Sequence, residues 1–312
     1  MKTRNIFGVI CLALVMAIPA KAQEIKKNEA MSFSRIVRNP AMAGKGFAGL
    51  AKPESMAWSS FGNSAVIPFS EETFDVGVIY QNWAPGGTKS ANLALGTAGR
   101  FTKNFGASLG FVMQSGEKFP IYNESGALKG ESTPSDLQVN LGLGYKFGEV
   151  VAVGLNAKYM RSSLMEGAAY SAFATDIFAQ CRFAGASVAL GISNLGSSVK
   201  DSEGNPFKIP ASVTLGADYT LKVADLHAFN FDLDCDYFFS GNFAAAFGFE
   251  YGVNDMVFAR AGYHFGTEHA VLPSFASVGI GLKFFGAKLD LAYLTANEFL
   301  GNTIVVGLGY SF

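Results

Sequence analysis

The chain has 312 residues, among them 36 glycines and 29 phenylalanines, while only 16% of its residues are charged and its formal net charge is −1. Intrinsic disorder and coiled coils both require a much higher content of charged residues, so this composition excludes them. The absence of a positive surplus or a long basic run excludes a nucleic-acid partner. The composition therefore predicts a folded protein with an unusually apolar, glycine-rich and aromatic character.

The first 22 residues have the pattern of a secretory signal peptide. Lys2 and Arg4 precede an apolar run over 6–18, and Ala20 and Ala22 supply the small residues that a signal peptidase requires. The apolar run is too short to cross a bilayer as a helix, which disfavours an uncleaved anchor. We therefore predict export and cleavage after Ala22.

The segment 23–70 lacks the alternation found in the rest of the chain and is dense in small residues. It is either a disordered tail or a plug inside a larger structure. Large apolar side chains such as Met42, Phe47 and Trp58 disfavour a tail, because disordered segments avoid such groups. We therefore expect a plug. Its most informative residues are Arg38, Asn39, Pro40, Met42, Gly44, Gly46, Trp58 and Asn63.

From residue 71 onward, apolar residues recur at every second position. The segments 139–147, 151–159 and 304–312 each place apolar residues on one face and small or polar residues on the other, which is the periodicity of a β-strand. About fourteen such strands are predicted. They span 73–83, 90–101, 105–115, 136–147, 150–161, 171–183, 185–193, 211–222, 228–239, 242–252, 255–265, 275–285, 287–295 and 302–312.

Two all-β architectures show this alternation, a soluble sandwich and a transmembrane antiparallel β-barrel. The apolar faces often end in aromatic residues, such as Tyr145 and Phe147, which is typical of the aromatic girdles of outer-membrane barrels. The chain also ends on an alternating strand with Tyr310 and Phe312, the type of C-terminus used in barrel assembly. These features favour a barrel of about fourteen strands over 71–312, in the lipid of the cell outer membrane.

The connections between the predicted strands differ in length. Tight turns near 148–149, 184–185 and 286 fit the periplasmic end of a barrel. Longer connections at 116–134, 162–170, 194–210 and 266–273 carry charge, glycine and proline, and are expected to be extracellular loops. A barrel of this size has a lumen too wide for its wall side chains to fill, which is a second reason to expect a plug.

Polar side chains at inward positions are candidates for a lumenal site. Asp232, Asp234 and Asp236 follow one another on one strand face at i, i+2 spacing, roughly 7 Å apart. They indicate either a cation site or a polar wall in which inward cations balance the charge. We favour the polar wall, with Lys158 and Arg260 as possible partners of the aspartates.

No motif for catalysis, a metal or a cofactor is present. The histidines His227, His264 and His269 have no ligand spacing with one another or with a cysteine, and there is no nucleophile elbow or phosphate loop. We therefore predict a protein that is not an enzyme and has no cofactor. Cys181 and Cys235 are expected to remain unpaired thiols, with a disulfide as the alternative.

Several motifs, taken together, resemble the PorV/PorQ family of outer-membrane proteins. The stretch 38–48, followed by Trp58 and Asn63, is similar to the family's opening motif. The segments 258–263, 277–284 and 289–293, and the ending at 310–312, resemble its C-terminal strands. The resemblance implies a FadL-like barrel with an N-terminal plug, as found in Bacteroidetes-type bacteria.

The resemblance also implies a function. Proteins of this family bind the C-terminal domains of cargo in type IX secretion, so the first hypothesis is a binding and shuttle component with secreted cargo and other secretion proteins as partners. The alternative is a FadL-like transporter of hydrophobic small molecules, and a weaker one is a structural barrel within an envelope complex. The loops 116–134, 194–210 and 266–273 would be the contact surfaces for cargo.

Overall fold

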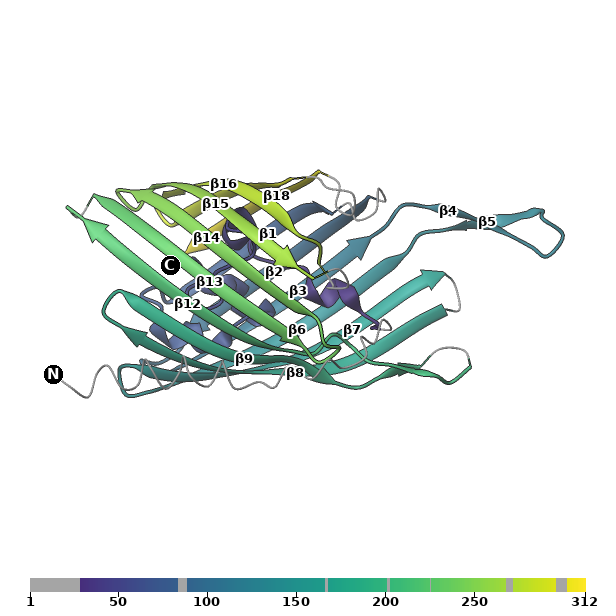
Figure 1. Cartoon of the computed structure of the whole chain (residues 1–312), viewed down its shortest axis with the longest axis horizontal. Helices are drawn as coiled ribbons and strands as arrows, with labels where there is room; N and C mark the ends of the chain where they lie inside the picture. The colour runs from purple at the N-terminus through teal and green to yellow at the C-terminus, as the bar shows by residue number, and fades with distance from the viewer. Residues whose placement is uncertain are drawn as a thin grey trace.

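The computed structural model describes residues 29–83, 89–165, 168–200, 203–224, 226–267, 272–295 and 302–312. In this part of the chain, fourteen antiparallel strands close into a barrel (Figure 1), in the order β1-β18-β17-β16-β15-β14-β13-β12-β9-β8-β7-β6-β3-β2. The barrel strands are β1 (Phe74–Trp83), β2 (Ser90–Arg100), β3 (Phe105–Ser115), β6 (Ser135–Phe147), β7 (Val151–Met165), β8 (Ala168–Phe183), β9 (Ala186–Gly196), β12 (Ser212–Val223), β13 (His227–Phe238), β14 (Phe243–Val253), β15 (Val257–Gly266), β16 (Phe275–Phe284), β17 (Ala287–Leu294) and β18 (Thr303–Ser311). The predicted fourteen-strand barrel is confirmed.

One predicted loop is wrong. The connection expected over 162–170 is largely strand, because β7 continues to Met165 and β8 begins at Ala168. The pairing of Ser162 with Tyr170 and of Ser163 with Ala169 continues the ladder beyond the predicted ends. Serine and alanine carry little strand preference, so the local pattern missed strands that are held by their neighbours.

The alternation places apolar side chains on the outer face and small or polar ones on the inner face. In β7, Val153 and Leu155 are exposed, while Gly154 and Asn156, which alternate with them, are buried. Exposed aromatic residues gather near both ends of the strands, for example Phe147 and Phe284 at one end and Tyr80 and Tyr263 at the other. An outer face of this kind matches the hydrocarbon layer of a membrane and its two interfaces.

The first and last strands close the barrel. β1 pairs with β18, and Tyr310 lies opposite Val76 in the ladder. The backbone N–H of Phe312 donates to the carbonyl of Phe74 at 2.8 Å. Tyr310 and Phe312 both point outward, as the sequence predicts for the C-terminal strand.

The two ends of the barrel differ. The short turns after β2, β6, β8 and β16 share one end, which we call the short-turn end. The opposite, long-loop end carries two additional hairpins, β4 (Phe119–Tyr122) with β5 (Leu128–Ser132), and β10 (Val199–Lys200) with β11 (Pro206–Phe207). The β4–β5 hairpin projects well beyond the barrel (Figure 1).

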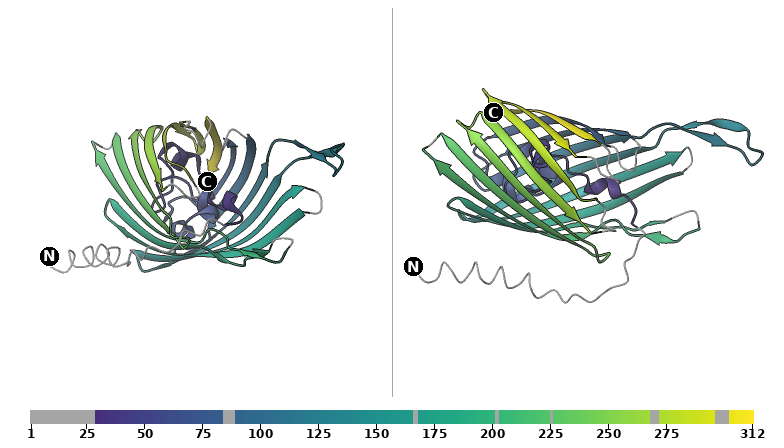
Figure 2. Two further views of the ribbon diagram at one scale, coloured as in Figure 1. Left: turned by 45° about the vertical axis from the view of Figure 1, so that its right-hand side comes forward. Right: turned by 45° about the horizontal axis from the view of Figure 1, so that its top comes forward.

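The N-terminal segment, residues 29–70, forms short helical turns that lie within the curve of the barrel strands (Figure 2). These are η1 (Ser32–Arg35), α2 (Pro40–Gly44), η2 (Met56–Phe61) and η3 (Ser64–Phe69). Asn39 caps α2 by accepting from the N–H groups of Ala41 and Met42, and Pro40 fits the first helical position. The asparagine-proline pair therefore starts a helical turn.

Other sequence-based predictions meet the structure only in part. The signal peptide over 1–22, residues 23–28 and His269 lie outside the described residues. Within the described residues, no helix has the length and apolarity to cross a membrane. Cys181 on β8 and Cys235 on β13 have β9 and β12 between them, so their thiols are too far apart for a disulfide.

Candidate functional site

The inner wall is rich in glycine where the N-terminal segment lies against it. A Cβ atom added at Gly262 would lie 2.0 Å from the carbonyl carbon of Lys45, and one at Gly96 would lie 2.3 Å from the carbonyl oxygen of Ala57. Both distances are shorter than any van der Waals contact, so only glycine allows this approach. Similar contacts with the segment occur at Gly77, Gly106, Gly110, Gly144, Gly154, Gly248 and Gly307.

We call the half of the lumen near the short-turn end the inner half. There, a buried lysine fixes the segment to the wall. The ammonium of Lys45 lies 2.8 Å from a carboxylate oxygen of Asp232 on β13 and 2.7 Å from one of Glu54. Lys45 is completely buried. A buried ammonium is costly unless it is paired with carboxylates, so these contacts fix the position of the segment after α2.

The charges of this cluster shift one another's titration. Burial alone lowers the pKa of Lys45, but the carboxylates of Asp232 and Glu54 outweigh it and raise that pKa above its usual value. Burial alone raises the pKa of Glu54, but the cations Lys45 and Arg260 outweigh it and lower that pKa below 4.5. Both groups are therefore charged at neutral pH.

The three aspartates of β13 all face the lumen and contact the N-terminal segment. Asp232 pairs with Lys45, and Asp236 pairs with Arg35 at 2.9 Å. Asp234 accepts from the backbone N–H groups of Gly49 and Leu50 at 2.9 and 3.0 Å. The aspartate row therefore holds the N-terminal segment between Arg35 and Leu50.

The partners proposed for these aspartates from the sequence are wrong. Lys158 pairs with Asp176 on the adjacent strand at 2.6 Å. Arg260 on β15 pairs with Glu250 on β14 at 2.6 Å and with Asp290 on β17 at 2.5 Å. Neighbouring strands supply the partners of both cations because their side chains are only one or two strand spacings away.

In the half near the long-loop end, the outer half, apolar contacts predominate. The ring of Phe47 packs edge-on against Phe275 at 4.9 Å between centroids, and His264 stacks on Phe275 at 5.1 Å. Trp83 and Phe33 are buried in the same cluster. The same N-terminal segment is thus held mainly by a buried ion pair in one half. In the other half, rings and aliphatic groups hold it together with the partly exposed pair of Arg35 with Asp236.

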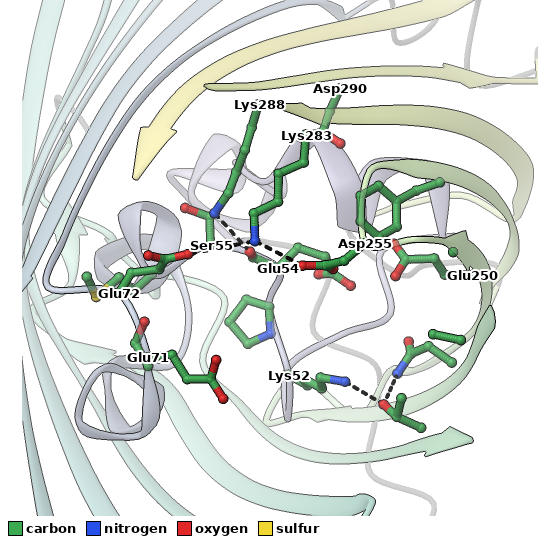
Figure 3. A pocket seen from close by; sticks show the side chains of 18 of the residues that line it. Lys52, Glu54, Ser55, Glu71, Glu72, Glu250, Asp255, Lys283, Lys288 and Asp290 are labelled. Atoms are coloured by element: carbon green, nitrogen blue, oxygen red, sulfur yellow. Dashed lines mark hydrogen bonds and ion pairs between the residues drawn. The ribbon is translucent and has the colours of Figure 1, made fainter. Parts of the chain in front are cut away.

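Cavities lie along the lumen among the described residues, and three of them mark its outer, central and inner parts. The outer cavity has a volume of about 260 Å³ and is lined by Phe33, Trp83 and Leu272 among others. The central cavity, about 120 Å³, lies between the N-terminal segment and the wall. The inner cavity, about 460 Å³, is lined mainly by charged side chains such as Lys283 and Lys288 (Figure 3).

The residues singled out in the N-terminal segment have distinct places. Arg38 is buried beside Asn92, Trp58 packs against Gly77, and Gly46 donates its N–H to Ser277 at 2.8 Å. Gly44 approaches the backbone of Gly279, and Met42 lines the central cavity. The amide of Asn63 donates to Gln180 at 2.6 Å. The structure brings all of them to the lumen.

Sequence reasoning missed Lys45, Glu54 and Arg35. Each stands alone among small or apolar residues, without the periodicity that identified the strands. The sequence did contain a signal for Lys45. A lysine in a stretch expected to be buried requires a carboxylate partner, and the aspartate row offers several.

No family model and no curated protein matches the chain, so the PorV/PorQ resemblance stays a sequence-based prediction. Solved structures do match. The chain is similar to the Pseudomonas putida toluene transporter TodX, with 12% identity, a TM-score of 0.60, and coverage of 88% of this chain and 97% of that one. At this identity the similarity shows the fold.

Two further structures show the same similarity. The CymD monoaromatic hydrocarbon channel has 14% identity and a TM-score of 0.63, covering 88% of this chain and 97% of that one. The Ralstonia pickettii toluene transporter TbuX has 12% identity and a TM-score of 0.60, covering 88% and 98%. These proteins share the barrel architecture over nearly their whole length.

Proposed function

We propose that this protein is an outer-membrane barrel that takes up small apolar molecules, with residues 29–70 acting as the plug of its lumen. The observation that carries the proposal is the series of cavities along the plug, which begins at the long-loop end with a cavity whose wall includes Phe33, Trp83 and Leu272. The structural neighbours, two toluene transporters and a monoaromatic hydrocarbon channel, support it. This is the alternative derived from the sequence.

Cavity size supports a small substrate. A dry apolar cavity of about 150 Å³ is sufficient for benzene. The outer cavity, at about 260 Å³, exceeds that size, whereas the central one, at about 120 Å³, is smaller. A molecule can therefore enter the outer cavity as it stands, but its passage inward requires the plug to shift around the central cavity.

Uptake of labelled toluene by cells is the direct test. Cells that express the protein should accumulate toluene faster than cells with an empty vector. Equal rates would contradict the proposal.

A reversible lock tests the role of the plug. A Cβ atom at Gly142 would lie 3.2 Å from that of Ser64, close to the roughly 3.5–4.5 Å of a disulfide. In a variant with Cys181 and Cys235 replaced by alanine, S64C/G142C should block uptake when oxidised and restore it on reduction. Each single cysteine variant is the control. Uptake that persists in the oxidised double variant would show that this part of the plug does not need to move.

A binding role in type IX secretion is a second proposal, and the β4–β5 hairpin favours it. The hairpin extends away from the barrel and exposes Tyr122 and Leu128 side by side. Aromatic residues of this kind are common in protein interfaces. Affinity capture from detergent-solubilised envelopes should recover cargo with a shared C-terminal β-domain if this proposal holds, and no such cargo if it does not.

A further inference from the structure

A row of polar side chains crosses five adjacent strands of the inner wall near the long-loop end. Gln81 on β1 lies opposite Asn92 on β2, which lies opposite Gln114 on β3. The row continues through Asp136 on β6 to Ser162 on β7. Strands are about 4.8 Å apart, so these five side chains form one continuous polar band in a region otherwise packed with apolar groups.

Much of the hydrogen-bonding capacity of this band is unused. Both amide atoms of Gln81, the amide nitrogen of Asn92 and the amide oxygen of Gln114 are buried and have no hydrogen-bond partner among the described residues. The same is true of the Nε and Nη1 atoms of Arg38, which lies beside Asn92. Native proteins rarely leave so many buried polar atoms unsatisfied at one place, and such a group points to a ligand or ordered water.

Arg38 differs from the other buried cations of the lumen. Lys45, Lys158 and Arg260 each have a carboxylate within 2.8 Å. Arg38 is only 4% exposed, and its hydrogen bonds are long, 3.4 Å to the carbonyl of Phe33 and 3.5 Å to Asn92.

The charge that acts on Arg38 comes from Asp136. One oxygen of that carboxylate accepts from the hydroxyl of Ser162 at 2.5 Å, and among the described residues the carboxylate forms no ion pair with the guanidinium. Burial lowers the pKa of Arg38 to about 9, so the guanidinium is still charged at neutral pH. A buried cation and a carboxylate thus act on each other without direct contact.

The outer cavity adjoins this arrangement. Phe33, Trp83 and Leu272 give it an apolar wall, while Gln114 and Asp136 give it a polar side. Arg38 itself lines the central cavity, and its guanidinium donates to the carbonyl of Phe33, a residue of the outer cavity, which places the guanidinium at the boundary between the two cavities. The site therefore combines room for a ring with one donor and one acceptor of opposite charge.

We propose that the outer cavity binds a small hydroxylated aromatic compound of the phenol class. The ring lies between Trp83 and Phe33, and the hydroxyl accepts from Arg38 and donates to Asp136. A hydroxyl is the smallest group that both accepts and donates, and a neutral ligand suits a site where the charges of Arg38 and Asp136 cancel. The inference deepens the proposed function by selecting a substrate class within small apolar molecules.

Tryptophan fluorescence provides the measurement. The chain has two tryptophans, and Trp83 lines the outer cavity, so W58F leaves a single reporter at the site. Purified W58F protein in detergent is titrated with p-cresol, toluene and benzoate, and the unmodified protein is titrated in parallel. We expect p-cresol to bind at least tenfold more tightly than toluene, and benzoate to bind more weakly than p-cresol.

Substitutions locate the effect. In W58F protein, R38M and D136N should each reduce p-cresol affinity to near that of toluene and leave toluene affinity unchanged. R161M is the matched control, because Arg161 is exposed on the outer face of β7 at a similar height. It should change neither affinity. If R38M fails to fold, R38K and the ligand series on the W58F protein decide the question.

The outcomes separate the two proposals. Equal affinities for p-cresol and toluene, or a preference for p-cresol that survives R38M and D136N, would overturn the phenol site and leave uptake of apolar molecules standing. Tighter binding of benzoate than of p-cresol would show an anion site and also overturn it. If none of the three compounds binds and toluene uptake is absent, the proposed function itself fails.

Discussion

The inner and outer halves of the lumen hold the same N-terminal segment by different physics. In the inner half, the completely buried Lys45 pairs with Asp232 on the wall and with Glu54 within the segment, at 2.8 and 2.7 Å. In the outer half, the segment packs mainly through Phe33 and Phe47, and its ion pair, Arg35 with Asp236, is partly exposed. Among the described residues, the cation Arg38 of this half has no ion pair. Ion pairs require fixed geometry, whereas apolar contacts tolerate small displacements. The difference teaches that one end of the segment is anchored and the other can adapt.

This division suits the proposed plug, which must shift without leaving the barrel. Buried ion pairs add little net stability over an apolar core, but breaking one by moving a partner away is strongly destabilising. The central cavity, the smaller of the two cavities on the proposed path, lies between the two halves. Movement confined to the outer half and the centre could enlarge it while the anchor holds.

Removing the lysine of the anchor should have the largest effect. In K45M, the buried carboxylates of Asp232 and Glu54 lose their cation, which should lower the free energy of unfolding by about 3–5 kcal/mol. Adding D232N should recover part of the loss, because it removes one unpaired charge. Urea unfolding of detergent-refolded protein measures both variants.

The control for K45M is K118M on the projecting hairpin. Lys118 and Glu131 form an exposed pair at 3.8 Å, so the expected change is within about 1 kcal/mol. If K45M were as stable as K118M, the inner half would not be an anchor, and the contrast between the two halves would fail.

Adding one methyl group to the wall should also loosen the anchor. In G262A, the new Cβ would overlap the backbone of Lys45, and such overpacking costs about 1–3 kcal/mol. G130A on β5 is the matched control, because a Cβ there meets no atom within 4 Å. The thermal unfolding midpoint should fall clearly for G262A and remain near that of the unmodified protein for G130A.

The anchor should weaken in acid. The folded-state pKa of Glu54 lies below its ordinary 4.5, so the unfolded chain takes up a proton first as the pH falls. The stability that Glu54 contributes is therefore complete above 4.5 and is lost as the pH falls through the folded-state pKa. Urea midpoints measured from about pH 6 to about pH 3 should decline less steeply in E54Q. An identical slope in both proteins would exclude Glu54 as a source of the pH dependence.

The sequence predicts the barrel well because period-two alternation is a local property. Each barrel strand buries alternate residues against the lumen, so its pattern is visible without knowledge of its neighbours, as in 139–147. The last residues of β7 and the first residues of β8 were missed because they are held by cross-strand pairing rather than by a pattern of their own.

The site is less visible in the sequence. The i, i+2 spacing predicted that Asp232, Asp234 and Asp236 share a face. It did not predict that Lys45, 187 positions away from Asp232, would be a partner. The N-terminal segment has no period, so nothing local shows which of its side chains face the wall. The unpartnered atoms around Arg38 become apparent only when the register aligns five strands.

The smallest effect is expected outside the lumen. The N–H of Gly116 donates to the carbonyl of Pro134 at 2.9 Å, so β3 and β6 already meet at the base of the β4–β5 hairpin. Replacing residues 118–132 with a short glycine linker should leave the unfolding free energy unchanged within about 0.5 kcal/mol, as for surface changes in general.

The same deletion separates the two proposed functions. Toluene uptake should be unaffected, because no residue of the hairpin lines a described cavity of the lumen. Capture of secreted cargo, if it occurs in the unmodified protein, should be lost, because the deletion removes the exposed Tyr122 and Leu128. Loss of uptake would instead show that the hairpin belongs to the entrance, and would extend the adaptable outer half beyond the barrel rim.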